Sequence, residues 1–150
     1  MSAIASFVLL PQDVLPTLRS AASPTNLLSA RGKTVAHYRW SGYVMVTLLP
    51  YLAQRRQVDL MKSEEHELAV ELCRKMRSTY FIFTNTQKEK YLSLLAIDLF
   101  SKDELRDYFN HFNGARESDM IGEAMLDGVR ALHQSLASLD ANSVIVFSVG

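Results

Sequence analysis

Two short apolar segments near the ends of the chain set the strongest limit on its fold. Residues 3–10 read AIASFVLL, and residues 143–149 read SVIVFSV. Both are rich in β-branched and aromatic side chains and have little polar face, so each is expected to be a strand inside a sheet. A free tail of the second composition would expose an aggregation-prone strand. We therefore predict that the two segments pair side by side, in a relative direction that the sequence leaves open.

A third strand is expected at residues 79–84, TYFIFT, whose aromatic and β-branched content gives the strongest strand signal in the chain. We expect it in the centre of the sheet. Residues 23–33, SPTNLLSARGK, differ because they contain many turn formers and no sustained periodicity. That segment is predicted to be a mobile surface loop.

Most of the remaining chain is predicted to be helical, because hydroxyl or carboxylate caps precede its apolar periodic segments. The helix that follows Ser101 carries the cleanest amphipathic stripe, and Phe109 and Phe112 are expected to anchor it to the core. Small residues on the last helix are expected to let another element approach closely. These small residues are Ala124, Gly128, Ala131 and Ser135. The predicted helices run from Asp13 to Ala22, from Ser41 with a kink or division at Pro50, after Ser63, after the capping boxes Thr86-x-x-Glu89 and Ser101-x-x-Glu104, and from Ser118 to about Leu139.

These elements add up to one α+β domain over residues 1–150. A chain of 150 residues is near the usual length for one hydrophobic core. No linker, repeat or low-complexity tract divides it. We predict a small sheet of three to four strands that includes both chain termini, packed by about five to six helices.

The chain opens with a strand of the form M-x-x-I-x-x-F, which is Met1, Ile4 and Phe7 here, and closes with a long helix and a terminal strand, Ile121 to Gly150. In these features the layout resembles the YfbM-like family of uncharacterised bacterial proteins. It implies a bacterial protein of this fold. It brings no catalytic residues with it, because the family has none established.

Charge and composition argue against several partners and compartments. Sixteen Lys and Arg balance sixteen Asp and Glu, so no long-range field draws the chain to nucleic acid or to a membrane surface. The longest apolar run, residues 42–53, contains Pro50 and is shorter than the ~20 residues that a spanning helix needs. Cys73 is the single cysteine, and the N-terminus lacks a basic start and a cleavage site. Cytoplasmic localisation is therefore expected.

The sequence shows no pattern typical of a metal site, a cofactor site or a nucleophilic enzyme. The four histidines have neither i, i+4 pairing nor zinc-type cysteine spacing, so no metal and no cofactor are predicted. Cys73 and His66 share a helix face but are ~10 Å apart along its axis, and a buried structural cysteine is favoured. Asp119, Glu123 and Asp127 form an acidic stripe that is expected to be a solvated helix edge.

Candidate binding residues come from two segments. Residues 38–43, YRWSGY, bring Arg39, Trp40 and Tyr43 together, a composition that is typical of binding hot spots and also of aromatic plugs at core ends. In the second segment, Asp107 lies four residues before His111, which permits an ion pair across one helical turn.

Two functional hypotheses follow. The first is a protein-interaction module of immunity or regulatory type, a monomer or a homodimer, because a small neutral domain without recognisable catalytic motifs suits that role. The alternative is a small-molecule-binding protein or minor hydrolase with a pocket near Trp40, Asp107 and His111.

Overall fold

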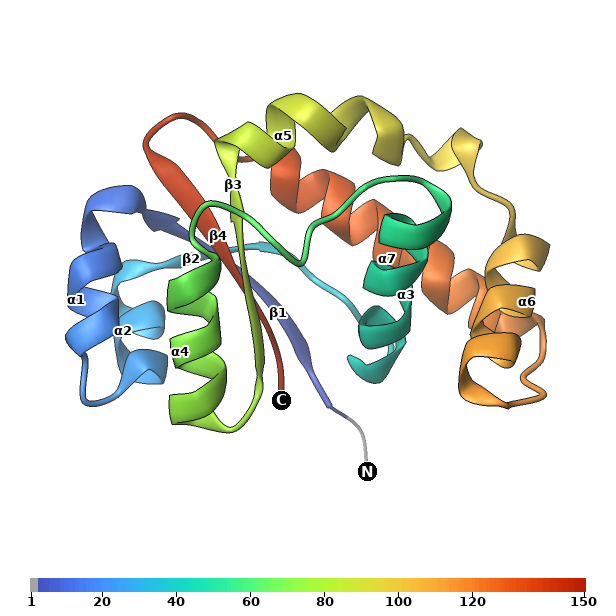
Figure 1. The fold of residues 1–150 in the computed structure, drawn as a ribbon, viewed down its shortest axis with the longest axis horizontal. Helices are drawn as coiled ribbons and strands as arrows, with labels where there is room; N and C mark the ends of the chain where they lie inside the picture. Colours follow the sequence, from blue (N-terminus) through green and yellow to red (C-terminus); the bar gives the residue numbers. More distant parts are fainter. Residues whose placement is uncertain (1–2) are drawn as a thin grey trace.

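A four-stranded antiparallel sheet lies at the centre of the molecule (Figure 1). The computed structural model describes residues 3–150. The strand order is β2-β1-β4-β3, and the strands are β1 (Ala5–Pro11), β2 (Lys33–Ala36), β3 (Thr79–Thr84) and β4 (Ser143–Val149). The predicted pairing of the two end segments is confirmed, and its direction is antiparallel. It continues past the strands, where the Ile4 N–H donates to the Gly150 carbonyl at 2.9 Å.

Helices make up most of the rest of the described chain. The α+β class and the sheet that includes both terminal strands are confirmed, with seven α-helices in residues 3–150 against the five to six predicted. They are α1 (Leu15–Ser20), α2 (Pro24–Arg31), α3 (Tyr43–Arg55), α4 (His66–Met76), α5 (Asn85–Tyr91), α6 (Lys102–Asn113) and α7 (Asp119–Ala137), with short 3-10 helices η1 (Gln12–Val14), η2 (Leu92–Leu95) and η3 (Ile97–Leu99). Within residues 3–150, no helix combines the length and apolarity that crossing a membrane requires.

The helices form two layers, one on each face of the sheet. In Figure 1, α1, α2 and α4 lie on one side of the strands, and α3, α6 and α7 lie on the other. Alternate strand residues supply the two cores. Phe7 and Phe147 are fully buried in the larger core with α3 and α7, whereas Ile82 and Val146 belong to the smaller core with α1 and α4.

The strand TYFIFT forms as predicted, but its predicted place at the centre of the sheet is wrong. β3 is an edge strand that pairs with β4 alone. Its composition is that of a buried strand because both of its faces are covered, with Ile82 at 2% and Phe83 at 0% exposure. Burial of side chains and position in the hydrogen-bonded ladder are thus separate properties, and the apolar pattern reports only the first.

The predicted mobile loop at residues 23–33 is also wrong, because most of it is the helix α2. The Ser23 hydroxyl caps this helix by accepting the Asn26 N–H at 3.4 Å, and Pro24 occupies the first turn, where its missing N–H costs no helix bond. Lys33 then begins β2, which pairs with β1. The turn-forming residues therefore cap the two ends of α2, and Gly32 leads directly into β2.

Other helix boundaries differ from the predictions in detail. α3 continues through Pro50, so of the predicted kink or division the division is wrong. α5 starts at a capping box formed by Thr84 and Gln87 rather than by Thr86 and Glu89. The caps at Ser101 and Ser118 are confirmed by their hydrogen bonds to backbone N–H groups.

The stripe of α6 anchors the helix less completely than predicted. Leu105 and Tyr108 are buried, and Phe109 packs against the larger core. Phe112 is 48% exposed and stacks on Tyr108 with ring centroids 5.6 Å apart, so its predicted role as a core anchor is wrong.

The small residues of α7 allow close helix contacts, as predicted. A Cβ added at Gly128 would lie 2.6 Å from Cδ2 of Leu48 and 2.9 Å from Sδ of Met45, both on α3. Of the two glycines in α7, Gly122 has the tighter contact, because a Cβ there would lie 2.5 Å from the Lys102 carbonyl oxygen at the start of α6. Gly122 therefore sets the approach of α6 to α7.

Gly122→Ala should destabilise the protein by about 1 to 3 kcal/mol, the usual cost of overpacking, although alanine is the better helix former. Gly128→Ala is the matched variant and should cost less, because flexible side-chain ends can move and a backbone carbonyl cannot. Urea unfolding at equilibrium measures both. A Gly122→Ala protein as stable as the wild type would show that the α6–α7 contact is looser than described.

Candidate functional site

A cleft of about 880 Å³ lies at the β2 edge of the sheet. Its walls come from β1, α2, β2, the segment after β2, and α7. We call it the β2-edge cleft. Its lining mixes hydroxyl, amide and charged groups with apolar side chains, as expected for a site that could orient a polar ligand.

The β2-edge cleft extends around the edge strand and reaches both faces of the sheet. Asp127 and Arg130 line it from α7, on the side of the larger core. Ser6 and Ser148 line it from the opposite face, because they alternate with Phe7 and Phe147 of the larger core. The cleft can curve in this way because β2 is only four residues long.

Three polar side chains form a row across β1, β4 and β3 on that opposite face. Ser6 of β1 is in register with Ser148 of β4, and Ser148 is in register with Tyr80 of β3. All three line the β2-edge cleft. Burial raises the pKa of Tyr80, and a hydrogen bond with Thr25 of α2 offsets part of that rise. The row gives this end of the cleft a neutral, hydroxyl-rich floor.

The carboxylate of Asp127 organises the opposite wall of the cleft. Its Oδ2 accepts the indole N–H of Trp40 at 2.7 Å, and its Oδ1 accepts a guanidinium N–H of Arg130 at 2.7 Å. The Arg39 guanidinium lies 3.6 Å from Oδ2 and 4.5 Å from the centroid of the Trp40 ring. We call these four residues the Asp127 cluster.

The electrostatics of the Asp127 cluster favour its ionised state. Partial burial opposes ionisation of the Asp127 carboxyl. The hydrogen bonds from Trp40 and Arg130, together with the positive charges of Arg130 and Arg39, outweigh that effect, so the pKa of Asp127 is lowered. Because its oxygens are already engaged by strong donors, Asp127 is poorly suited to accept a proton from a substrate. Its role in the cluster is to hold two arginines and an indole in place.

A buried tyrosine fixes the segment that carries Arg39 and Trp40. The Tyr38 hydroxyl donates to the Ala124 carbonyl of α7 at 2.7 Å. Burial, together with the nearby Asp127 charge, raises the pKa of Tyr38. The neutral phenol therefore stays a donor, and the segment that follows β2 is held against α7 one turn before Asp127.

The five predicted binding residues occupy three separate places. Arg39 and Trp40 belong to the Asp127 cluster. Tyr43 is 58% exposed and lines a smaller cleft beside the C-terminus. Asp107 and His111 line a third cleft of about 420 Å³, on α6. The structure thus joins Arg39 with Trp40, and joins Asp107 with His111, without bringing the two pairs together.

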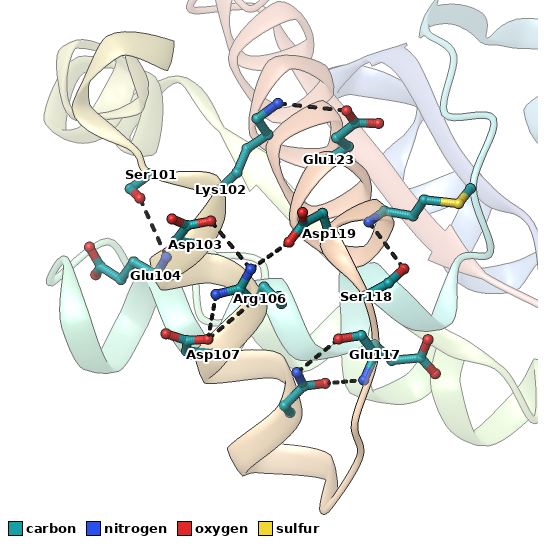
Figure 2. Close-up of polar contacts among 12 residues, drawn as sticks. Ser101, Lys102, Asp103, Glu104, Arg106, Asp107, Glu117, Ser118, Asp119 and Glu123 are labelled. Atoms are coloured by element: carbon teal, nitrogen blue, oxygen red, sulfur yellow. Dashed lines mark hydrogen bonds and ion pairs between the residues drawn. The ribbon is translucent and has the colours of Figure 1, made fainter.

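Figure 2 shows that Asp107 belongs to a network around Arg106. The Arg106 guanidinium contacts Asp103 and Asp107 on α6 and Asp119 at the start of α7. The predicted ion pair between Asp107 and His111 is absent from residues 3–150, where Asp107 pairs with Arg106 instead. This network joins two helix starts, and its exposed carboxylates are screened by water.

The acidic stripe of α7 is only partly a solvated edge. Glu123 pairs with Lys102 at 3.6 Å with both side chains about half exposed, and Asp119 is 86% exposed, as predicted. Asp127 departs from the prediction, because it is 28% exposed and lies in the Asp127 cluster. Arg130 was not singled out in the sequence. Its position three residues after Asp127, on the same helix face, was the available signal.

The thiol of Cys73 has a structural role in α4. Its Sγ accepts the backbone N–H of Tyr80 at 3.2 Å, which links the helix to β3. The side chain is half-buried, rather than buried as predicted.

Comparisons with protein-family models, with curated proteins and with solved structures found no match to this chain. The resemblance to the YfbM-like family stays a prediction.

The Asp127 cluster predicts an acid-dependent loss of stability. Because the pKa of Asp127 is lower in the folded state, its stabilising effect is present above the unfolded value of about 3.9 and is lost as the pH falls through the folded value. Asp127→Asn should lower the free energy of unfolding by about 1 kcal/mol at pH 7, because the substitution replaces charge-assisted hydrogen bonds by neutral ones. The difference from wild type should shrink toward pH 3, measured by urea unfolding.

Asp98→Asn is the matched control, because Asp98 is exposed in η3. It should leave stability nearly unchanged across this pH range. An Asp127→Asn protein whose deficit stayed constant from pH 7 to pH 3 would contradict the assignment of Asp127 as the ionised centre of the cluster.

Proposed function

We propose that the protein binds a small molecule in the β2-edge cleft. The observation that carries this proposal is the convergence of polar groups from β1, β4, α2 and α7 on one cleft of about 880 Å³. Small-molecule sites usually measure roughly 300 to 1,000 Å³ and orient their ligands with a few convergent polar groups. The anchored wall supports the same proposal, because a preorganised site loses less entropy on binding.

Binding is proposed rather than hydrolysis. A hydrolase needs a general base near the reacting group. Asp127 is the carboxylate that lines the β2-edge cleft, and its oxygens accept hydrogen bonds from Trp40 and Arg130. A carboxylate stabilised in this way by its neighbours is a weak base. His37 also lines the cleft, but within residues 3–150 no carboxylate pairs with its imidazole to orient it. The site therefore fits ligand recognition better than proton abstraction.

A substitution that fills the cleft tests this proposal. Ser29 is an exposed α2 residue that lines the cleft, so Ser29→Trp should obstruct the cleft and leave the fold intact. Ala30→Trp is the matched control at the next position on the same helix. Two-dimensional NMR with pooled metabolites should show shifts at Ser6, Ser148 and the Trp40 indole in the wild type and in Ala30→Trp.

These shifts should be lost in Ser29→Trp, and the melting temperature of the wild type should rise with ligand concentration as binding linkage requires. If no pool shifts the resonances of the cleft residues, the proposal is wrong. Shifts that persist in Ser29→Trp would place the ligand elsewhere and would also contradict it.

We propose a protein-interaction role as a second function, because large apolar side chains are exposed where α3 meets α6. Tyr43 and Val46 share one face of α3 and are 58% and 41% exposed. The Asn113 amide donates to Thr47 at 3.1 Å, so the end of α6, which carries the exposed Phe112, contacts α3 one residue after Val46. Exposed aromatic and aliphatic groups of this kind often anchor protein partners.

The Val46→Asp, Phe112→Asp double variant tests the interaction role. A partner captured by the wild-type protein should be lost by the double variant and retained by Leu94→Asp, which changes an exposed leucine in η2. Capture that is equal for all three proteins would exclude this face as the interface.

A further inference from the structure

The β2-edge cleft carries two guanidinium groups on one wall. Arg39 comes from the segment after β2 and Arg130 from α7, and both approach the carboxylate of Asp127. Two cations and one anion leave the Asp127 cluster with a net charge of +1. The carboxylate between the two guanidinium groups offsets the repulsion between their like charges.

Both arginines keep donors that Asp127 does not use. A guanidinium has five N–H donors in a planar fork that matches the oxygens of carboxylate and phosphate groups. Arg130 gives one hydrogen bond to Asp127, through Nη1. Arg39 lies at 3.6 Å, beyond a direct hydrogen bond, and its side chain is 75% exposed. The remaining donors are accessible to a ligand.

The indole of Trp40 contacts Arg39 directly and also holds the carboxylate that binds Arg130. Its N–H holds Oδ2 of Asp127, and its ring lies beneath the Arg39 guanidinium. Exposed arginines usually lose much side-chain entropy when they bind an anion. Arg39 and Arg130 have part of that freedom removed beforehand, which lowers the cost of binding.

Apart from the Asp127 cluster and His37, the side chains that line the cleft are neutral. Gln134 lies one helical turn beyond Arg130, and Ser29 of α2 and Ser148 of β4 supply hydroxyls. Positive charge is therefore concentrated on one wall, while hydroxyl and amide groups extend around the edge of β2. This arrangement suits a ligand with one anionic group and a polar, uncharged body.

Resting on the proposed function, we infer that the ligand of the β2-edge cleft is a small organic anion whose carboxylate or phosphoryl group is bound by Arg39 and Arg130. The shared chemistry is an anionic group with at least two oxygens, which can accept from both guanidinium groups at once. Its polar body contacts the row formed by Ser6, Ser148 and Tyr80.

Trp40 provides a direct probe of this inference, because it is the single tryptophan of the chain and belongs to the cluster. Inorganic phosphate and succinate are titrated separately at constant ionic strength, with sodium chloride as the compensating salt and sorbitol as a neutral polyol. Indole fluorescence and melting temperature are recorded together. Wild-type protein should show a saturable change with phosphate or with succinate, and the tighter of the two identifies the preferred anion class.

Arg130→Gln and Arg39→Gln should each weaken that binding by about tenfold or more, because each removes charge-assisted hydrogen bonds. Arg116→Gln is the matched control, an exposed arginine in the loop between α6 and α7. It should bind as the wild type does. Circular dichroism of each variant verifies the fold, and the melting-temperature readout remains valid where Arg39→Gln alters the indole signal itself.

The inference is overturned if neither anion gives a saturable change, or if binding is unaffected in both arginine variants. Saturable binding of sorbitol with no response to either anion would also overturn it, while leaving small-molecule binding in the cleft intact. The metabolite pools and the Ser29→Trp variant test that broader proposal independently.

Discussion

The antiparallel pairing of β1 with β4 is the interaction on which the rest of the structure depends. It runs from Ala5 opposite Val149 to Pro11 opposite Ser143, and it places the first and last strands at the centre of the sheet. Each strand contributes apolar side chains to both faces, so the two cores share this pair. The ring of Phe147, for example, packs near the rings of Phe7, Phe81 and Phe83. Without the central pair, neither helical layer has a complete surface to cover.

The same arrangement leaves one edge of the sheet available for a site. β2 is short, and the chain leaves β1 after Ala36 to run toward α3. The Tyr38 hydroxyl then holds that departing segment on α7. As a result Arg39 and Trp40 meet Asp127, and a cleft opens around the strand end. The site is thus a consequence of how β2 ends, and its charged wall is positioned by contacts between segments about 87 residues apart.

Sequence patterns correctly predicted the elements whose buried residues form a clear periodic or apolar pattern along the chain. β4 and α7 are strongly periodic or apolar throughout, and both form close to their predicted bounds. α2 was missed because only Pro24 and Leu28 in it are buried, too few for a helical stripe to be visible. β3 was placed at the centre because an edge strand covered on both faces has the composition of an interior one.

The candidate site could be predicted only in part for a related reason. Arg39 and Trp40 stood out because their residue types are concentrated in one short segment. Asp127 was visible only as a member of an acidic stripe, and no spacing rule relates it to a tryptophan far away in the chain. Whether a carboxylate is solvated or held by an indole depends on tertiary contacts, which local periodicity does not encode.

Native-state hydrogen exchange measured by NMR tests the central pairing most directly. If β1 and β4 form the centre of the sheet, their hydrogen-bonded amides should exchange only through global unfolding, with the highest protection in the protein. The outward-facing amides of the edge strands β2 and β3 should exchange faster, through local opening. Amides of residues 143–149 that exchanged as rapidly as a frayed chain end would contradict the account.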